Sequence, residues 1–263
     1  MDDPRRPHHY RPPMKHLLIA AITLLAIATT PARAETSSHS LPLYTTIEHQ
    51  PQSATLAALA PEADPEVLSL ALAAMRCAQA HGVGTSAHRL AVIDYSRSSL
   101  TPRLWVFDLA RNQLLFHLLV AHGQGSGGDI PQHFSNAEGS HASSLGLFHT
   151  LNTYQGSNGY SLRMEGLEPG FNDAAYSRAI VMHGAGYVNA NAGQQMGRLG
   201  RSWGCPAVRN AMARPVIDVL KDGQFLFAYY PEQKWLMRSS LAQCAQARVR
   251  RKQEEATRLA SSR

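Results

Sequence analysis

A cysteine and a histidine near the end of the chain are the residue types best suited to chemistry. Cys205 lies in the stretch GRSWGCPAV, and His183 lies upstream in IVMHGAGY. The thiolate is the nucleophilic form of cysteine, and a free thiol is only a few per cent ionised at neutral pH. A protonated imidazole that lowered the thiol pKa by about two units, equivalent to about 2.7 kcal/mol, would make most of the sulfur reactive. The sequence therefore indicates a Cys205 nucleophile with His183 as its base.

The backbone around Cys205 fits the same chemistry. Gly204 has no side chain, so a carbonyl substrate could approach the backbone closely. The N–H of Cys205, together with that of Gly204, could then serve as oxyanion donors. A free cysteine is also commonly a small buried apolar residue, and a packing role is the alternative that these residues alone leave open.

The first 34 residues have the three parts of a secretory signal. Four basic residues precede position 16, an apolar run covers residues 17–28, and an Ala-Arg-Ala sequence ends at Ala34. Such a pattern predicts export with cleavage after Ala34. The apolar run is shorter than the roughly 20 residues that span a bilayer, although an uncleaved anchor is the alternative. We expect a protein of the periplasm or cell envelope, with no stable membrane span after cleavage.

The cysteine count fits an oxidising compartment with one thiol left over. Cys77, Cys205 and Cys244 make an odd set, so at least one has no partner within the chain. Cys77 and Cys244 lie in predicted helices at opposite ends of the exported part. Pairing these two would tie the ends together and leave Cys205 free, but the residues alone leave all three pairings open.

The rest of the chain predicts a mostly β domain flanked by helices. Residues 35–60 are rich in Ser, Thr and Pro and predict a linker, and residues 61–85 predict a helix with Asp64 as N-cap and Pro65 at its first position. Residues 86–235 predict the catalytic domain, and residues 236–263 a basic C-terminal helix or tail. We expect strands over 90–96, 103–109, 113–123, 143–151, 160–167, 179–185 and 224–231, with a short helix over 213–223.

Charge and histidine spacing weigh against nucleic-acid and metal functions. The net charge of +6 falls to +3 when residues 1–34, with five Lys or Arg and two Asp, are removed, and so mild an excess does not argue for a nucleic-acid partner. His133, His141 and His149 recur at even intervals, but no H-E-x-x-H or C-x-x-C motif accompanies them. We therefore expect no metal and no cofactor, with a zinc hydrolase as a remote alternative.

The segments HGAGY and GRLGRSWGCPAV together resemble the catalytic motif of YkuD-type L,D-transpeptidases, in which H-G is followed at a distance by S-x-G-C. The S-W-G-C-P-A form is most similar to the murein L,D-transpeptidase catalytic domain subfamily. The likeness extends over about residues 91–235, including LVAHGQGSGG and FSNAEGSHASSLGLF. It implies a mostly β fold, an L,D-transpeptidase-like sandwich or barrel with short helices.

The resemblance also implies roles for individual residues. Cys205 would be the nucleophile and His183 its base, the carbonyl of Gly184 would orient the imidazole, and Ser202 would shape the turn before the nucleophile. The donor would be a peptidoglycan stem tetrapeptide. Cys205 would attack the carbonyl at the L-centre of the third residue and expel the terminal D-alanine, and an amine on a second stem or on a protein would take the acyl group. Carbapenem β-lactams would acylate the same cysteine.

Two positions depart from the wider family. Most members have His two residues before the cysteine, where this chain has Trp203, and Arg two residues after it, in a position to meet a carboxylate, where this chain has Ala207. The expected substitutes for that arginine are Arg201, Arg209 or Arg198. Trp203 and Tyr187 are candidates to line a cleft for the stem peptide, or equally to pack in the core.

Two further functions are compatible with the same residues. Water could take the acyl group instead of an amine, which would make the protein an L,D-carboxypeptidase or endopeptidase. A non-catalytic wall-binding module is the alternative of another class, and it predicts that Cys205→Ala leaves function intact.

Overall fold

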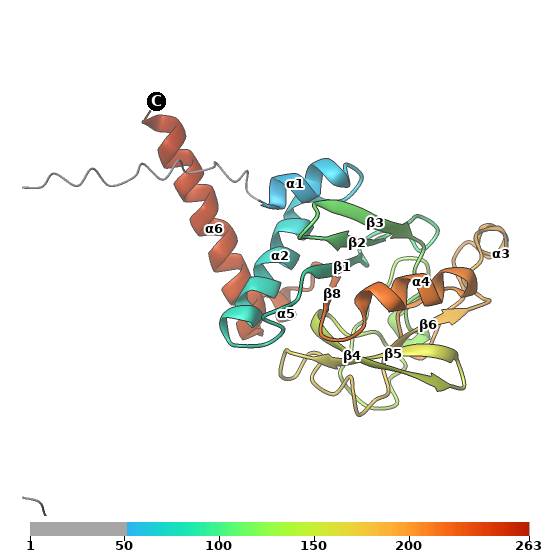
Figure 1. Ribbon diagram of the computed structural model, residues 1–263. Helices are drawn as coiled ribbons and strands as arrows, with labels where there is room; N and C mark the ends of the chain where they lie inside the picture. The colour runs from blue at the N-terminus through green and yellow to red at the C-terminus, as the bar shows by residue number, and fades with distance from the viewer. Residues whose placement is uncertain (1–51, 263) are drawn as a thin grey trace, which may run out of the picture. The chain divides into compact units, whose positions relative to one another are not determined.

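The structure, a computed structural model, describes residues 52–262 (Figure 1). The predicted signal peptide over residues 1–34 lies outside the described residues, as does the predicted linker as far as residue 51. The remainder of the expected linker differs from the prediction, because it carries a helix, α1 (Gln52–Leu59). Leu56 is fully buried in this helix, and the Arg76 guanidinium donates to Gln52 Oε1 at 2.7 Å. The stretch QSATLAAL is rich in Ala and Leu, which favour helix, so the helix agrees with its local sequence and the linker prediction extends too far.

Eight strands form one mixed sheet in the order β3-β2-β1-β8-β4-β5-β6-β7. The strands are β1 (Arg89–Asp94), β2 (Leu104–Asp108), β3 (Gln113–Leu118), β4 (Gly146–Gly156), β5 (Gly159–Gly166), β6 (Val181–Ala185), β7 (Ala207–Arg209) and β8 (Phe225–Tyr229). The pairs β1–β8 and β6–β7 are parallel, and the other neighbours are antiparallel. Short β7, which follows the candidate nucleophile, is absent from the sequence prediction.

The two edges of this sheet meet. After β3 the chain continues to Ala121, which forms a bridge with Ala207 of β7 and donates a backbone hydrogen bond to its carbonyl at 2.8 Å. A second bridge joins Gly123 to Ser202. A sheet that closes on itself leaves few unpaired edge groups. The predicted mostly β, barrel-like fold class is therefore confirmed.

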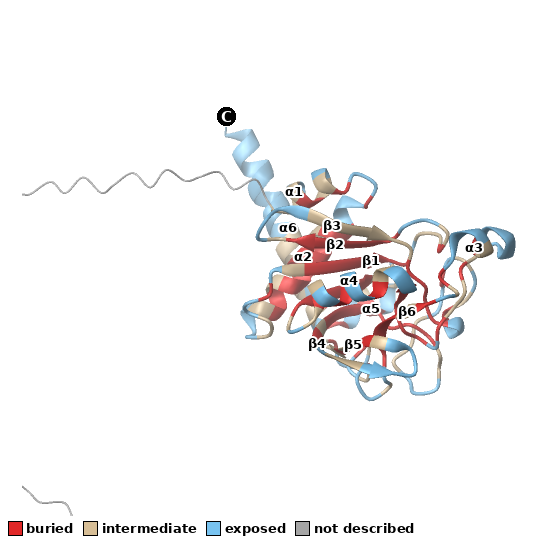
Figure 2. Cartoon of the chain, turned by 45° about the vertical axis from the view of Figure 1, so that its right-hand side comes forward, coloured by how far each residue is buried: buried red, intermediate tan, exposed pale blue. Residues whose placement is uncertain are grey.

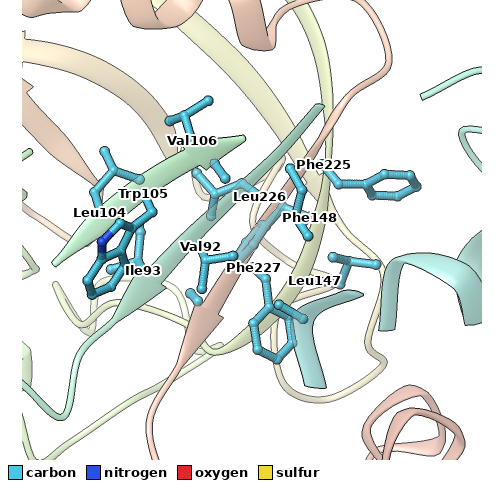
Figure 3. Packing of buried hydrophobic residues seen from close by; sticks show 14 of the residues in the cluster. Val92, Ile93, Leu104, Trp105, Val106, Leu147, Phe148, Phe225, Leu226 and Phe227 are labelled. Atoms are coloured by element: carbon cyan, nitrogen blue, oxygen red, sulfur yellow. The ribbon is translucent and has the colours of Figure 1, made fainter. Parts of the chain in front are cut away.

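The core lies around the central strands β1, β2 and β8 (Figure 3). Their apolar runs are buried on both faces, which is typical of central strands covered on either side. The labelled side chains of Figure 3 belong to this core: Val92, Ile93, Leu104, Trp105, Val106, Leu147, Phe148, Phe225, Leu226 and Phe227. Burial of this apolar surface, at about 25 cal/mol per Å², makes the sheet a rigid support for the loops at its β6–β7 end.

Helices flank the sheet at both ends of the described chain. Helix α2 (Pro65–Ala80) has the predicted N-cap, since Asp64 Oδ1 accepts from the Glu66 N–H at 2.8 Å. Its buried face contacts the sheet and the long C-terminal helix α6 (Ser240–Ser261), whose far end is exposed (Figure 2). The disulfide between Cys77 and Cys244 joins α2 to α6, which is the one of the three possible pairings that leaves Cys205 free.

Three shorter helices complete the fold. Helix α3 (Ala190–Met196) was not expected from the sequence, α4 (Asn210–Leu220) begins earlier than predicted and packs on β6, and α5 (Gln233–Arg238) leads into α6. None of the helices within residues 52–262 has the length and apolarity to cross a membrane.

Candidate active site

Cys205 lies in a tight turn that enters β7. Ser202 closes this turn with its side chain, because its hydroxyl donates to the Cys205 carbonyl at 2.6 Å and accepts from the Gly204 N–H at 3.1 Å. Gly204 has φ +117°, in the region that favours glycine. The hydroxyl of Ser202 and the conformational freedom of Gly204 together fix the direction of the cysteine.

The structure gives Gly204 another function than the one expected from the sequence. A Cβ at Gly204 would come within 2.8 Å of the Ala142 carbonyl oxygen, and the Gly204 carbonyl accepts from Ser143 Oγ at 3.0 Å. The glycine thus permits close packing of the turn against residues 142–143. In the free protein its N–H donates to Ser202 Oγ at 3.1 Å. The Cys205 N–H makes no hydrogen bond to another residue within residues 52–262, and it helps to lower the pKa of its own thiol.

The strand register brings His183 and Cys205 to the same face of the sheet. His183 of β6 is paired with Ala207 of β7, and the two strands are parallel. Two residues earlier on each segment, Val181 therefore falls opposite Cys205. The Val181 N–H lies 3.5 Å from Cys205 Sγ, in agreement with this register. Cys205 lies just before β7, and continuing the alternation of side chains along a strand over those two residues puts it on the same face as His183.

The sulfur is buried and turned toward the start of β6. Cys205 is 8% exposed and His183 is 3% exposed. Besides Val181, the sulfur contacts the carbonyl oxygen of Ala179 at 3.7 Å, and no hydrogen bond within the described chain joins it to His183. Catalytic hydrogen bonds are often long before a substrate binds, so the role of His183 as base stays a prediction.

The imidazole of His183 has a defined tautomer. Its Nδ1 lies 2.9 Å from the carbonyl oxygen of Gly184, and a carbonyl can only accept, so Nδ1 carries the proton. Nε2 is left with a lone pair. A Cβ at Gly184 would come within 2.9 Å of the Ala213 side chain on α4, so the glycine also lets α4 pack closely on this strand.

Burial sets the charge state of the pair and corrects one expectation. It raises the pKa of the Cys205 thiol and lowers the pKa of the His183 imidazole, because both charged forms lose hydration. The sequence predicts an imidazolium that ionises the sulfur. The structure instead favours a neutral thiol beside a neutral imidazole in the free protein, with the proton transferred as the sulfur attacks.

Arg178 is a functional candidate that sequence reasoning missed. Its guanidinium donates to Ser135 O and Ser144 Oγ at 2.7 Å, to Ala142 O at 2.8 Å and to Ser140 Oγ at 3.1 Å. Its charge lowers the pKa of Cys205 and so opposes the larger effect of burial. Arg178 directly precedes Ala179, whose carbonyl contacts the sulfur, but its residue type and spacing give no signal of these contacts.

The two aromatic residues predicted to line the cleft differ in exposure. Trp203 is 70% exposed and stacks on His141, with ring centroids 4.7 Å apart, so it is not a core residue. Tyr187 is half-buried. Burial raises its pKa to about 12, and the negative form of Cys205 adds to this rise.

The arginines expected to replace the missing family arginine lie at different places. Arg201 donates to the carbonyls of Gln124 at 3.3 Å and Gly127 at 2.5 Å. Arg198 donates to the Leu199 carbonyl at 2.9 Å, and Arg209 is exposed at the end of β7. The structure thus does not bring these three guanidinium groups together beside the sulfur.

The three evenly spaced histidines do not converge. His149 is bound to Glu165 at 2.9 Å, and His141 stacks on Trp203. Within residues 52–262, no group of three or more His, Cys, Asp or Glu side chains is placed to hold a metal ion.

Comparison with known proteins identifies one family. Residues 59–229 match the family described as L,D-transpeptidase catalytic domain, and the match includes the N-terminal helix α2. Among curated proteins, no sequence matches the chain.

Several solved structures are similar in fold at low identity. The LD transpeptidase LdtMt1 in complex with imipenem has 14% identity and TM-score 0.34, covering 54% of this chain and 59% of that one. An L,D-transpeptidase from Mycobacterium smegmatis has 13% identity and TM-score 0.35, covering 55% and 59%. One from Stackebrandtia nassauensis has 12% identity and TM-score 0.30, covering 63% and 67%. The chain thus spans 59% of the length of the first two.

Proposed function

The chain belongs to the family of L,D-transpeptidase catalytic domains, and on that premise we propose that it is an exported peptidoglycan L,D-transpeptidase that works through a Cys205 acyl-enzyme. One observation carries this proposal. Cys205 is a free thiol on the same sheet face as His183, whose Nδ1–H is bound to Gly184 so that Nε2 can accept a proton.

Acylation begins with the neutral pair. His183 Nε2 takes the Sγ proton as the sulfur attacks the carbonyl at the L-centre of the third stem residue. The Cys205 N–H donates to the oxyanion that forms. The tetrahedral intermediate collapses with cleavage of the peptide bond, and the imidazolium returns its proton to the leaving D-alanine amine. The result is a thioester between Cys205 and the third residue.

Transfer then completes the reaction. An amine on a second stem or on an anchored protein attacks the thioester, His183 takes a proton from that amine, and the thiol is restored. Water in place of the amine gives the carboxypeptidase or endopeptidase outcome from the same residues. Trp203 belongs to the turn that holds Cys205, and the Tyr187 carbonyl accepts from the Gly200 N–H just before that turn. We propose that both side chains contact the peptide.

Export is supported by chemistry independent of the leader. The structure has a disulfide between Cys77 and Cys244, and such bonds persist in oxidising compartments such as the periplasm. A signal peptide over residues 1–34, followed by a linker, remains our proposal for the start of the chain.

Carbapenem acylation is proposed for the same thiol. The ring carbonyl of a β-lactam resembles an activated amide, and attack by Cys205 would open the ring to give a stable thioester. One of the similar structures is an LD transpeptidase in complex with imipenem, which makes imipenem the probe of choice.

The test is muropeptide analysis after incubation of the purified mature protein with isolated sacculi. New dimers joined between third residues mean transfer, and loss of D-alanine without such dimers means hydrolysis. Cys205→Ser should abolish both. Unchanged muropeptides with wild-type protein that nevertheless binds sacculi would support the wall-binding module instead.

A further inference from the structure

We propose that Arg163 binds a carboxylate of the donor stem peptide, in a cavity that adjoins the Cys205 sulfur. This inference rests on the proposed function and gives it a specificity-determining residue. Arg163 would supply the positive charge that most of the wider family has two residues after the cysteine, where this chain has Ala207.

The sheet register aligns Arg163 with the nucleophile. Arg163 of β5 is paired with Val181 of β6, and Val181 faces Cys205 through the contact between its N–H and the sulfur. Arg163, Val181 and Cys205 thus form one row across three neighbouring chain segments, beside the row that contains His183. Neighbouring strands are about 4.8 Å apart, so the Cα atoms of Arg163 and Cys205 are about 10 Å apart on one face.

A cavity of about 220 Å³ lies at the Arg163 end of this row. Its lining includes the side chains of Tyr154, Arg163 and Tyr176, together with the segment from Ala179 to Val181. The same segment contacts the sulfur through the Ala179 carbonyl and the Val181 N–H. The cavity and the nucleophile therefore share one wall, and a substrate bound to Cys205 can extend into this space.

The guanidinium of Arg163 is available for a ligand. It stacks over the Tyr154 ring, with Cζ 4.0 Å from the ring centroid, and it makes no hydrogen bond or ion pair with any residue of the described chain. Arg178 and Arg201, by contrast, are bound to backbone carbonyls. Stacking occupies the flat face of a guanidinium and leaves its N–H edge free, and that edge matches a carboxylate with two parallel hydrogen bonds.

Two carboxylates of the donor are candidates for this arginine. One is the C-terminal carboxylate of the D-alanine that leaves. The other ends the side chain of the third residue when that diamino acid has a second carboxyl group, as diaminopimelic acid does. Both lie a few bonds from the carbonyl that Cys205 attacks, so the chemistry is shared and the two sources are separated by experiment.

The experiment measures binding without turnover. The mature protein with Cys205→Ser is titrated by calorimetry with three tetrapeptides: one with free diaminopimelic acid, one with the side-chain carboxylate of that residue amidated, and one that ends in D-alaninamide. Adding Arg163→Gln should weaken binding of the first peptide by about tenfold to a hundredfold, because a charged bidentate contact is lost. Adding Arg163→Lys should weaken it less, since the charge remains.

The amidated peptides identify the carboxylate. The peptide that lacks the carboxylate bound by Arg163 should bind weakly to the Cys205→Ser protein. Its affinity should not fall further when Arg163→Gln is added. The other amidated peptide should behave like the unmodified one. The proposal would be overturned if Arg163→Gln lowered the affinity for all three peptides equally, or for none of them.

Two controls separate this inference from general damage and from failure of the proposed function. Arg214 also stacks on a tyrosine, Tyr160, with Cζ 4.3 Å from the ring centroid, so Arg214→Gln should leave the affinities unchanged. A selective loss with Arg209→Gln, and none with Arg163→Gln, would reassign the contact. Release of D-alanine by the wild-type protein together with unaltered binding by Arg163→Gln would refute only the Arg163 assignment, whereas absence of both release and binding would refute the proposed function with it.

Discussion

At the scale of single residues, two effects compete at Cys205. Burial disfavours the thiolate, while the Arg178 guanidinium and the Val181 N–H favour it, and burial is the larger effect. The net effect favours the neutral thiol in the free protein. The proposed mechanism accordingly has His183 take the thiol proton as the sulfur attacks.

The pH dependence of alkylation tests this charge state. Burial raises the pKa of Cys205, so the thiolate becomes the major form only above the ordinary thiol pKa of about 8.5. The rate of iodoacetamide labelling at Cys205 should keep rising with pH beyond about 8.5, in the manner of an acid with a raised pKa. A plateau that begins near pH 6 would show a thiolate–imidazolium pair instead.

Removal of the base should affect turnover far more than this alkylation profile. His183→Ala should lower the rate of D-alanine release by at least about 100-fold, because general-base catalysis contributes 10²–10⁴-fold. The alkylation profile of the variant at high pH should stay close to that of the wild type, since hydroxide replaces the base there. Turnover that survives His183→Ala would assign the base to another residue.

At the scale of elements, one buried carboxylate connects β4 to the C-terminal helices. Glu168 Oε1 accepts from the Leu147 N–H at 2.7 Å, and Oε2 accepts from Trp235 Nε1 at 2.6 Å and from the Ser239 hydroxyl. Trp235 lies in α5, and Ser239 is the N-cap of α6. Three donors from separate segments thus depend on one side chain.

Glu168→Ala should lower the free energy of unfolding by about 2–4 kcal/mol, because buried donors lose their acceptor. Glu165→Ala is the matched control: Glu165 is bound to His149 but is 47% exposed, so its loss should cost about 0–1 kcal/mol. Chemical denaturation of both variants measures the difference. An equal fall in the free energy of unfolding for the two variants would contradict the role assigned to Glu168.

The sequence predicts the long elements well and the site only in outline. Alternating or continuous apolar runs locate seven of the eight strands, and Asp64 with Pro65 locates the start of α2. Three-residue β7 has no period to detect, and the Ala- and Leu-rich α1 is hidden at the end of a stretch whose overall composition predicts a linker. The row of Arg163, Val181 and Cys205 depends on pairing between strands distant in sequence, which no local pattern contains.

At the scale of the whole molecule, the chain ends of the described region are tied together. The disulfide joins α2 to α6 across 167 residues, so nearly the whole catalytic domain lies within the covalent loop. Closing so long a loop restricts the unfolded chain strongly, which stabilises the folded protein by about 2–5 kcal/mol.

Replacing both cysteines tests this contribution. The variant with Cys77→Ser and Cys244→Ser should unfold at a clearly lower temperature than the oxidised wild type. Adding reductant should bring the wild type to the level of the variant and should leave the variant unchanged. A wild type whose unfolding temperature is insensitive to reductant under denaturing conditions would show that the bond contributes little.

The most direct measurement is the intact mass of the mature protein after incubation with imipenem, compared with that of Cys205→Ser. We predict a gain of one imipenem on the wild type, located by peptide mapping at Cys205, and no gain on the variant. An unmodified wild type whose Cys205 still reacts with iodoacetamide, or an equal adduct on the variant, would contradict the assignment of this sulfur as the acylated nucleophile.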